Sequence, residues 1–179
     1  IPGGNNRYPD TRMGVEQVLE DAFTRAKNYQ KEWEVYNDAK DKKGMPVPRR
    51  DLELEALVEI LEKKRFITCH SYVQSEINMA MEVGNRMGYT VNTFTHILEG
   101  YKVADKMLKH GSYVSTFSDW WAYKMEVEDA IPYNAAIMQK VGLIVAINSD
   151  DAEMARRLNQ EAGKIVKYGG VTEEEALKM

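Results

Sequence analysis

The sequence predicts an α/β protein in which parallel strands alternate with helices. From residue 66 onward, short apolar runs typical of buried strands are separated by amphipathic segments long enough to form helices. Parallel strands need long crossover connections of this kind, whereas antiparallel strands can be joined by tight turns. The four runs are 66–70, 90–96, 112–118 and 143–149.

The first fifty residues have a different character. Gly, Asn and Pro in residues 1–13 indicate an irregular loop. Apolar residues then recur at three- and four-residue spacing, which predicts a long helix over 13–40. One glycine and two prolines in 41–50 predict a break. Asp51 is a suitable N-cap for an amphipathic helix that follows it.

Helices are expected after each of the four runs. The segment after the third run carries Trp120, Trp121 and Tyr123, which we interpret as core or rim packing residues, with the wall of a pocket as the alternative. Thr172 is the expected cap of a last helix. The expected helices are 74–87, 101–110, 131–140 and 151–167.

Composition restricts the classes of function. With 179 residues the chain can bury one sizeable core. A net charge of −4 gives no reason to expect nucleic acid as a partner, and no apolar run is long enough to span a membrane. The single cysteine, Cys69, lies inside an apolar run and is interpreted as an inert, buried thiol. The cellular compartment stays open.

We expect one partial domain over residues 1–179, with a loop, long helix and linker in 1–50 and βα repeats in 51–179. The start lacks an initiator methionine and a signal-peptide pattern, and the end falls in or at the end of a helix. Both ends are therefore expected to be cut from something longer, or matured by cleavage.

Side-chain parity favours part of a barrel over an open sheet covered on both faces. His70 and His96 end the first two runs, and Asp150 follows the fourth. Alternation places His96 on the same face as Phe94, and Asp150 on the same face as Asn148. All three candidates then fall on the more polar face of their strands, as at the active rim of a barrel.

Two imidazoles and a carboxylate that converge from strand ends could hold Zn²⁺ or a similar divalent ion. Such an ion activates a bound water, and Asp150 could move its proton. Each residue also has a plainer interpretation, because lone histidines at strand ends are commonly structural. An Asp after a strand commonly caps a helix, but Asp151 can do so here. His110 is interpreted as a cation at a helix C-terminus.

Several segments together resemble the C-terminal half of a metal-dependent amidohydrolase, with the imidazolonepropionase-like amidohydrolases as the most similar branch. The resemblance runs from about residue 48 to the end, and His, His, Asp is the order of that superfamily on strands five, six and eight. It is carried by "CHSY" (69–72), "THILEGYKVADKM" (95–107), "STFSDWWAYK" (115–124), "IPYNAAIM" (131–138) and "INSDDAEMARRLNQEAGKIVKYGGVTEEEALK" (147–178).

The resemblance implies about half of a TIM-like (β/α)₈ barrel from an enzyme that hydrolyses C–N bonds in small amides or cyclic amides. It implies that His70 is a metal ligand, and that His96 is a ligand or contacts the substrate or the metal-bound water. Asp150 is implied as ligand and proton shuttle. The metal is expected to be Zn, with Fe, Mn or Ni compatible. Proximity to His96 makes the following residues candidate substrate contacts: Glu99, Tyr101 and Lys102.

The chain departs from the family because the His-x-His pair of strand one has no counterpart among its three histidines. The isolated chain is therefore expected to bind metal weakly and to be inactive. Open sheet edges predict that it self-associates or pairs with the missing half of the barrel. Two other functions remain open: a non-catalytic α/β module that packs or binds a partner, and a deaminase of the same superfamily.

Overall fold

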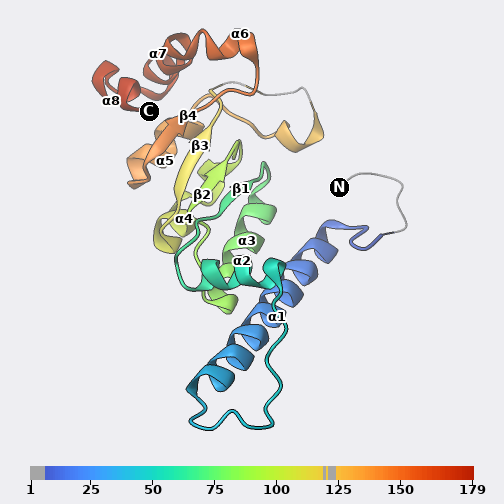
Figure 1. The fold of residues 1–179 in the computed structure, drawn as a ribbon. Coiled ribbons are helices and arrows are strands. Elements are labelled where there is room, and N and C mark those ends of the chain that lie inside the picture. The colour runs from blue at the N-terminus through green and yellow to red at the C-terminus, as the bar shows by residue number, and fades with distance from the viewer. Residues whose placement is uncertain (1–6, 119, 121–123) are drawn as a thin grey trace. The chain divides into compact units, whose positions relative to one another are not determined.

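The structure is a computed structural model that describes residues 7–118, 120 and 124–179 (Figure 1). Trp121 and Tyr123, interpreted above as packing residues, lie outside the described residues. In chain order the elements are α1 (Arg12–Asp38), α2 (Leu52–Leu61), β1 (Thr68–His70), α3 (Gln74–Met87), β2 (Thr93–Thr95), η1 (Gly100–Lys102), α4 (Ala104–His110), β3 (Tyr113–Thr116), η2 (Met125–Val127), α5 (Asn134–Val141), β4 (Val145–Ile147), α6 (Ala152–Ala155), α7 (Leu158–Gly169) and α8 (Glu173–Lys178).

The chain divides into two compact units. One contains the residues up to Phe66 together with 83–89, and the other contains 67–82 and 90–179. None of the described helices combines the length and the apolar character that a membrane crossing requires.

In the first unit, α2 packs against α1 through a polar contact at Tyr29. The Tyr29 hydroxyl donates to Glu55 Oε1 at 3.2 Å and accepts from the backbone N–H of Asp51 at 3.3 Å. Arg50 holds the same carboxylate through two hydrogen bonds of 2.7 and 3.0 Å. The contacts of Tyr29 and Arg50 fix the start of α2, where Asp51 caps the helix as predicted. Nearer the start of α1, Phe23 stacks on Tyr89 with ring centroids 4.1 Å apart.

The second unit is built on a four-stranded sheet in the order β1-β2-β3-β4, with every pair parallel. This confirms the predicted α/β class with parallel strands. Each observed strand lies inside its predicted run and is shorter than it. The carboxyl ends of all the strands therefore meet along one edge of the sheet.

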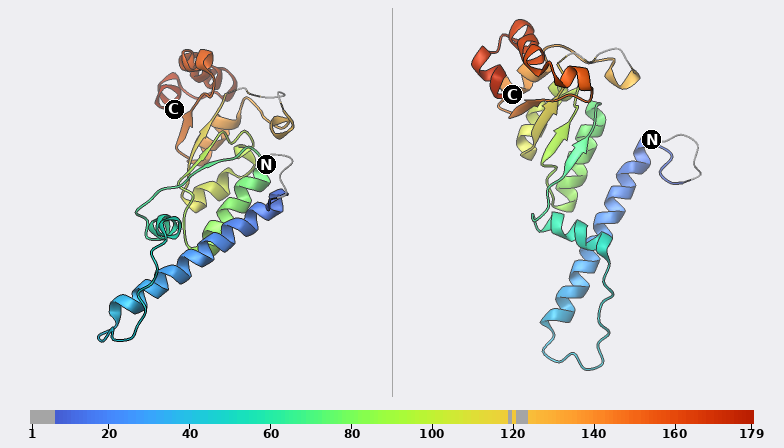
Figure 2. Two further views of the ribbon diagram at one scale, coloured as in Figure 1. Left: turned by 45° about the vertical axis from the view of Figure 1, so that its right-hand side comes forward. Right: turned by 45° about the horizontal axis from the view of Figure 1, so that its top comes forward.

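The two faces of the sheet differ in burial. Phe94, Val114 and Val145 are paired neighbours on one face and are 0%, 2% and 5% exposed. Helices α3, α4 and α5 lie along this face (Figures 1 and 2). The opposite face carries polar residues such as His70 and Thr95, which are paired with each other. The helices α3, α4, α5 and α7 contribute fully buried side chains to the core, among them Ile77, Met107, Met138 and Ile165.

The helix caps follow the sequence closely. Asp151 accepts the N–H groups of Glu153 and Met154, both at 2.9 Å, and Thr172 accepts that of Glu175 at 3.2 Å. The predicted helix 151–167 is instead two helices, α6 and α7, because the chain turns at residues 156 and 157.

His110 differs from its predicted role as a cation at the end of a helix. Its Nε2 accepts the backbone N–H of Val91 at 3.0 Å, and burial lowers its pKa. An imidazole nitrogen that accepts a hydrogen bond carries no proton, so His110 is neutral in this arrangement. It joins the end of α4 to the segment that leads into β2.

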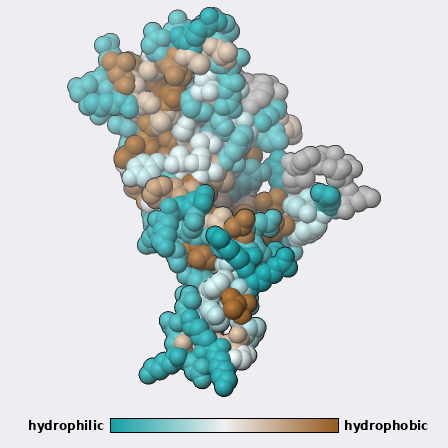
Figure 3. Space-filling model, viewed as in Figure 1, coloured by the Kyte–Doolittle hydropathy of each residue, from teal (hydrophilic) through white to brown (hydrophobic). Residues whose placement is uncertain are grey.

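The outer edges of the sheet differ. At β4, the N–H of Ile147 donates to the carbonyl oxygen of Met179 at 2.8 Å. At β1, no second strand is paired within the described part of the chain. Apolar patches interrupt the hydrophilic surface (Figure 3), and Phe66, just before β1, is 76% exposed.

Candidate active site

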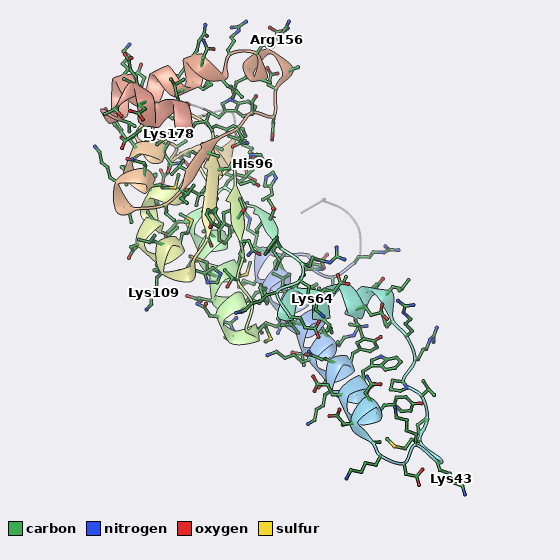
Figure 4. All side chains as sticks on the ribbon, turned by 60° about the vertical axis from the view of Figure 1, so that its left-hand side comes forward. Lys43, Lys64, His96, Lys109, Arg156 and Lys178 are labelled. Atoms are coloured by element: carbon green, nitrogen blue, oxygen red, sulfur yellow. The ribbon has the colours of Figure 1, made fainter. Side chains whose placement is uncertain are left out.

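The three predicted site residues come together at the carboxyl ends of the strands. His70 is the last residue of β1, and His96 follows the last residue of β2. Their ring centroids are 4.2 Å apart. Asp150 lies beyond β4, and its Oδ2 is 3.6 Å from His96 Nε2. His96 therefore links the other two residues, and Figure 4 shows it at this end of the sheet.

The backbone of His96, rather than strand alternation, aims its side chain. Alternation predicts that His96 shares the face of Phe94, but β2 ends at Thr95 and Phe94 lies on the helix-covered face. His96 has φ = 71°, in the left-handed region that few non-glycine residues adopt. The prediction that side-chain parity orients His96 is therefore wrong. A turn of the backbone directs the imidazole toward His70 and Asp150.

A column of nearly parallel rings fixes the plane of the His96 imidazole. Tyr72 stacks on His96 at 5.8 Å and 19°, and Phe117 stacks on His96 at 4.9 Å and 18°. Trp120 continues the column beyond Phe117 at 4.4 Å. Lys124 lies over the Tyr72 ring, 3.7 Å from its centroid. Stacking against Tyr72 and Phe117 therefore restricts the plane of the His96 imidazole.

Two polar residues that the sequence analysis did not select complete the site. Asn148 Nδ2 lies 3.2 Å from His96 Nδ1. Asn148 Oδ1 accepts the Ser115 hydroxyl at 2.7 Å. The fourth run did carry a signal for Asn148, which has the same strand parity as Asp150. Ser115 is a buried hydroxyl that no sequence pattern distinguished from its neighbours.

The environment favours a neutral His96. Burial is the main cause that lowers its pKa, and His70 and Lys124 act in the same direction. The carboxylate of Asp150 opposes them by attracting a proton. The His96 side chain is 11% exposed, whereas that of Asp150 is 49% exposed. The site is therefore open on the Asp150 side and closed behind the imidazole.

The three candidate substrate residues hold the loop after β2. Glu99 Oε2 accepts the N–H of Gln74 at 2.9 Å and lies 3.3 Å from Lys102 Nζ. Lys102 also pairs with Asp129. The Tyr101 hydroxyl donates to the carbonyl oxygen of Asp129 at 3.0 Å. The structure thus gives all three residues contacts within the protein, and their contact with a substrate stays a prediction.

The donor set only partly suits a metal ion. Two imidazoles and a carboxylate are suitable ligands for zinc. However, among the residues that the structure describes, no group of three or more His, Cys, Asp or Glu side chains is arranged to hold an ion. His96 Nδ1 is also engaged with Asn148. The described residues therefore do not form a metal centre by themselves.

Comparison with known proteins identifies the fold. No protein-family profile and no curated protein matched the sequence. Among solved structures, the chain is similar to an amidohydrolase from Thermotoga maritima MSB8, with a TM-score of 0.81 and 26% sequence identity. The match covers 94% of this chain and 43% of the solved chain.

The structure matches part of an amidohydrolase domain. Its four parallel strands and their helices match part of an amidohydrolase barrel, which confirms the predicted fold. The chain spans less than half the length of the related structure. In a barrel of this kind the carboxyl ends of the strands carry the active site. In this chain that edge holds His70, His96 and Asp150.

Proposed function

We propose that this chain supplies one side of the active site of a metal-dependent hydrolase that acts on C–N bonds of small non-peptide amides or cyclic amides. The observation that carries the proposal is the convergence of His70, His96 and Asp150 at the strand ends of a partial amidohydrolase domain. A structural role alone does not require three ionisable side chains to meet there, with the Asp150 carboxylate half exposed.

His70 and Asp150 are the proposed metal ligands, and both side chains are exposed enough to reach an ion. Asp150 also takes and returns a proton, because its carboxylate is accessible and lies beside a second polar group, His96. A divalent ion, when bound, would polarise the scissile carbonyl and supply a water of lowered pKa. The ion needs further ligands, which we place on the part of the barrel that this chain does not contain.

The proposal implies a difference between the chain alone and a longer polypeptide. We expect the chain alone to hold zinc in less than stoichiometric amount and to hydrolyse no amide. We expect a longer polypeptide, in which preceding βα units complete the barrel, to hold zinc and to hydrolyse members of an amide and cyclic-amide panel. Metal content and product formation would be measured side by side.

Variants of the proposed ligands test whether zinc binding and hydrolysis depend on this site. We expect His70→Ala and Asp150→Asn to lower both the zinc content and the hydrolysis rate of the longer polypeptide. Asp151→Asn is the matched control, because asparagine also caps helices and the side chain at residue 151 already serves as the cap of α6. The proposal is wrong if all three variants keep the zinc content and rate of the unmodified protein.

A further inference from the structure

Polar contacts link His96 to other side chains in a continuous row. The Ser115 hydroxyl contacts Asn148 Oδ1 at 2.7 Å, and Asn148 Nδ2 contacts His96 Nδ1 at 3.2 Å. On the other side of the ring, His96 Nε2 faces Asp150 Oδ2 at 3.6 Å. Four side chains, one from β3 and three from the segments that follow β2 and β4, are thus arranged in a row, with the imidazole as the third.

The position of the Asp150 carboxylate decides which groups donate and which accept along this row of polar side chains. A neutral imidazole has one N–H donor and one acceptor nitrogen, while an ionised carboxylate only accepts. With the proton on Nε2, that N–H points at Asp150, and Nδ1 accepts from the Asn148 amide. The amide oxygen then accepts from Ser115, so every atom in the row has a suitable neighbour. With the proton on Nδ1, the Nε2 lone pair would face the carboxylate of Asp150.

We propose that Asn148 holds His96 in the tautomer with its proton on Nε2, so that His96 is a hydrogen-bond donor to the substrate rather than a metal ligand. The role toward substrate rests on the function proposed above, whereas the tautomer does not. Asn148 is a positioning residue in this proposal, since it acts through the imidazole.

The geometry around Nε2 suits such a donor. At 3.6 Å the contact with Asp150 is within ion-pair distance but longer than a direct hydrogen bond, so the N–H is not already committed. The half-exposed carboxylate marks the side from which a substrate oxygen or leaving group can approach. The stacked rings of Tyr72 and Phe117 restrict the plane in which this N–H lies.

The tautomer can be read directly from the nitrogen chemical shifts and long-range couplings of the histidine rings in the ¹⁵N-labelled chain. The spectrum would be recorded well above the ordinary histidine pKa of about 6.5, so that neutral rings are observed. We expect the Nε2–H pattern for His96. His110 is an internal reference with the opposite expectation, because its Nε2 accepts the N–H of Val91.

Asn148→Asp tests the cause. The aspartate keeps the size of the side chain but can only accept, so we expect His96 to move its proton to Nδ1. The lone pair freed on Nε2 then faces Asp150, and we expect Co²⁺, titrated as a spectroscopic probe, to bind roughly tenfold or more tightly than to the unmodified chain. Asn37→Asp, at an exposed position on α1, is the control for the added charge and should change neither measurement.

Two results would overturn the proposal: an Nδ1–H pattern for His96 in the unmodified chain, or an unchanged His96 pattern in a folded Asn148→Asp variant. The measurement on the unmodified chain decides the matter by itself if the variant does not fold. The two proposals can fail separately. If His96 shows the Nε2–H pattern but the longer polypeptide hydrolyses no amide, the tautomer is supported and the proposed function is wrong. If the longer polypeptide hydrolyses amides but His96 shows the Nδ1–H pattern, the proposed function is supported and the tautomer is wrong.

Discussion

His96 and His110 show how two half-buried or buried imidazoles in one domain can be held neutral in opposite ways. Burial lowers the pKa of both. His110 presents Nε2 as an acceptor to a backbone N–H, which ties the end of α4 to the start of the β2 segment. His96 presents one nitrogen to an amide and the other to a carboxylate, close to the surface. The arrangement of His110 stabilises the fold, whereas that of His96 leaves a ring nitrogen near the surface, where a ligand could contact it.

The structural role of His110 makes a pH-dependent prediction. Its pKa is lowered in the folded state, so the native chain binds fewer protons there than the unfolded chain. The contribution of His110 to the free energy of unfolding is therefore complete above the unfolded pKa of about 6.5 and is lost as the pH falls through the lower folded value. Urea unfolding over a pH series measures it.

Two variants separate this contribution from that of the carboxylates. His110→Gln can still accept the Val91 N–H but does not titrate, so we expect a smaller loss of stability below about pH 6.5. His110→Ala leaves that N–H without its acceptor, and we expect a cost of about 1 to 3 kcal/mol at neutral pH. An unchanged pH profile in His110→Gln would contradict the interpretation.

At the scale of elements, the sequence was sufficient for what depends on local chemistry. Asp51, Asp151 and Thr172 cap the helices that they were expected to cap. The order of strands and helices also followed, because apolar runs and amphipathic segments have distinct periods. The candidate residues at the strand ends followed as well, since parallel strands bring their carboxyl ends to one edge.

Other features could not be predicted because they depend on tertiary contacts. The left-handed backbone at His96 redirects a side chain that alternation places on the opposite face. The neutral state of His110 depends on Val91, which lies nineteen residues earlier in the chain. The role of the Asn148 amide depends on its contact with His96, and the two residues follow different strands of the sheet.

Helix α7 offers a matched pair of glycines. A Cβ added at Gly169 would lie 2.3 Å from the Cβ of Ala136, whereas one added at Gly163 meets nothing within 4 Å. We expect Gly169→Ala to destabilise the packing of α7 on α5 by about 1 to 3 kcal/mol. Gly163→Ala should stabilise the chain by about 0.5 to 1 kcal/mol through helix propensity. The urea midpoint of each variant is compared with that of the unmodified chain. Shifts of opposite sign would support this prediction, and equal shifts would refute it.

At the scale of the whole molecule, the main feature is a partial barrel in which β1 pairs with only one strand among the residues that the structure describes. Ile67 accepts from the N–H of Thr93, and Ser71 donates to the carbonyl of Thr95. Backbone groups alternate along a strand, so those of Thr68 and His70 point away from β2. Unpaired strand edges are templates for association with another chain. This edge is where we propose that a second copy, or the remainder of the barrel, pairs.

We therefore expect the chain to self-associate at micromolar concentration, as measured by size-exclusion chromatography with light scattering. Thr68→Pro removes the outward N–H without removing a hydrogen bond to β2, and it should lower the associated fraction. Thr68→Val keeps that N–H and is the matched control. A strictly monomeric chain, or equal association by the two variants, would show that the edge of β1 is not used.

The left-handed backbone at His96 has a consequence for how this position can vary. Holding a non-glycine residue there costs on the order of 1 kcal/mol, which glycine or asparagine would largely recover. A library randomised at residue 96 and selected only for resistance to proteolysis should thus enrich those two amino acids. Selection for turnover in a completed barrel should restore histidine. If the two selections enrich different amino acids, then stability and catalysis favour different side chains at residue 96.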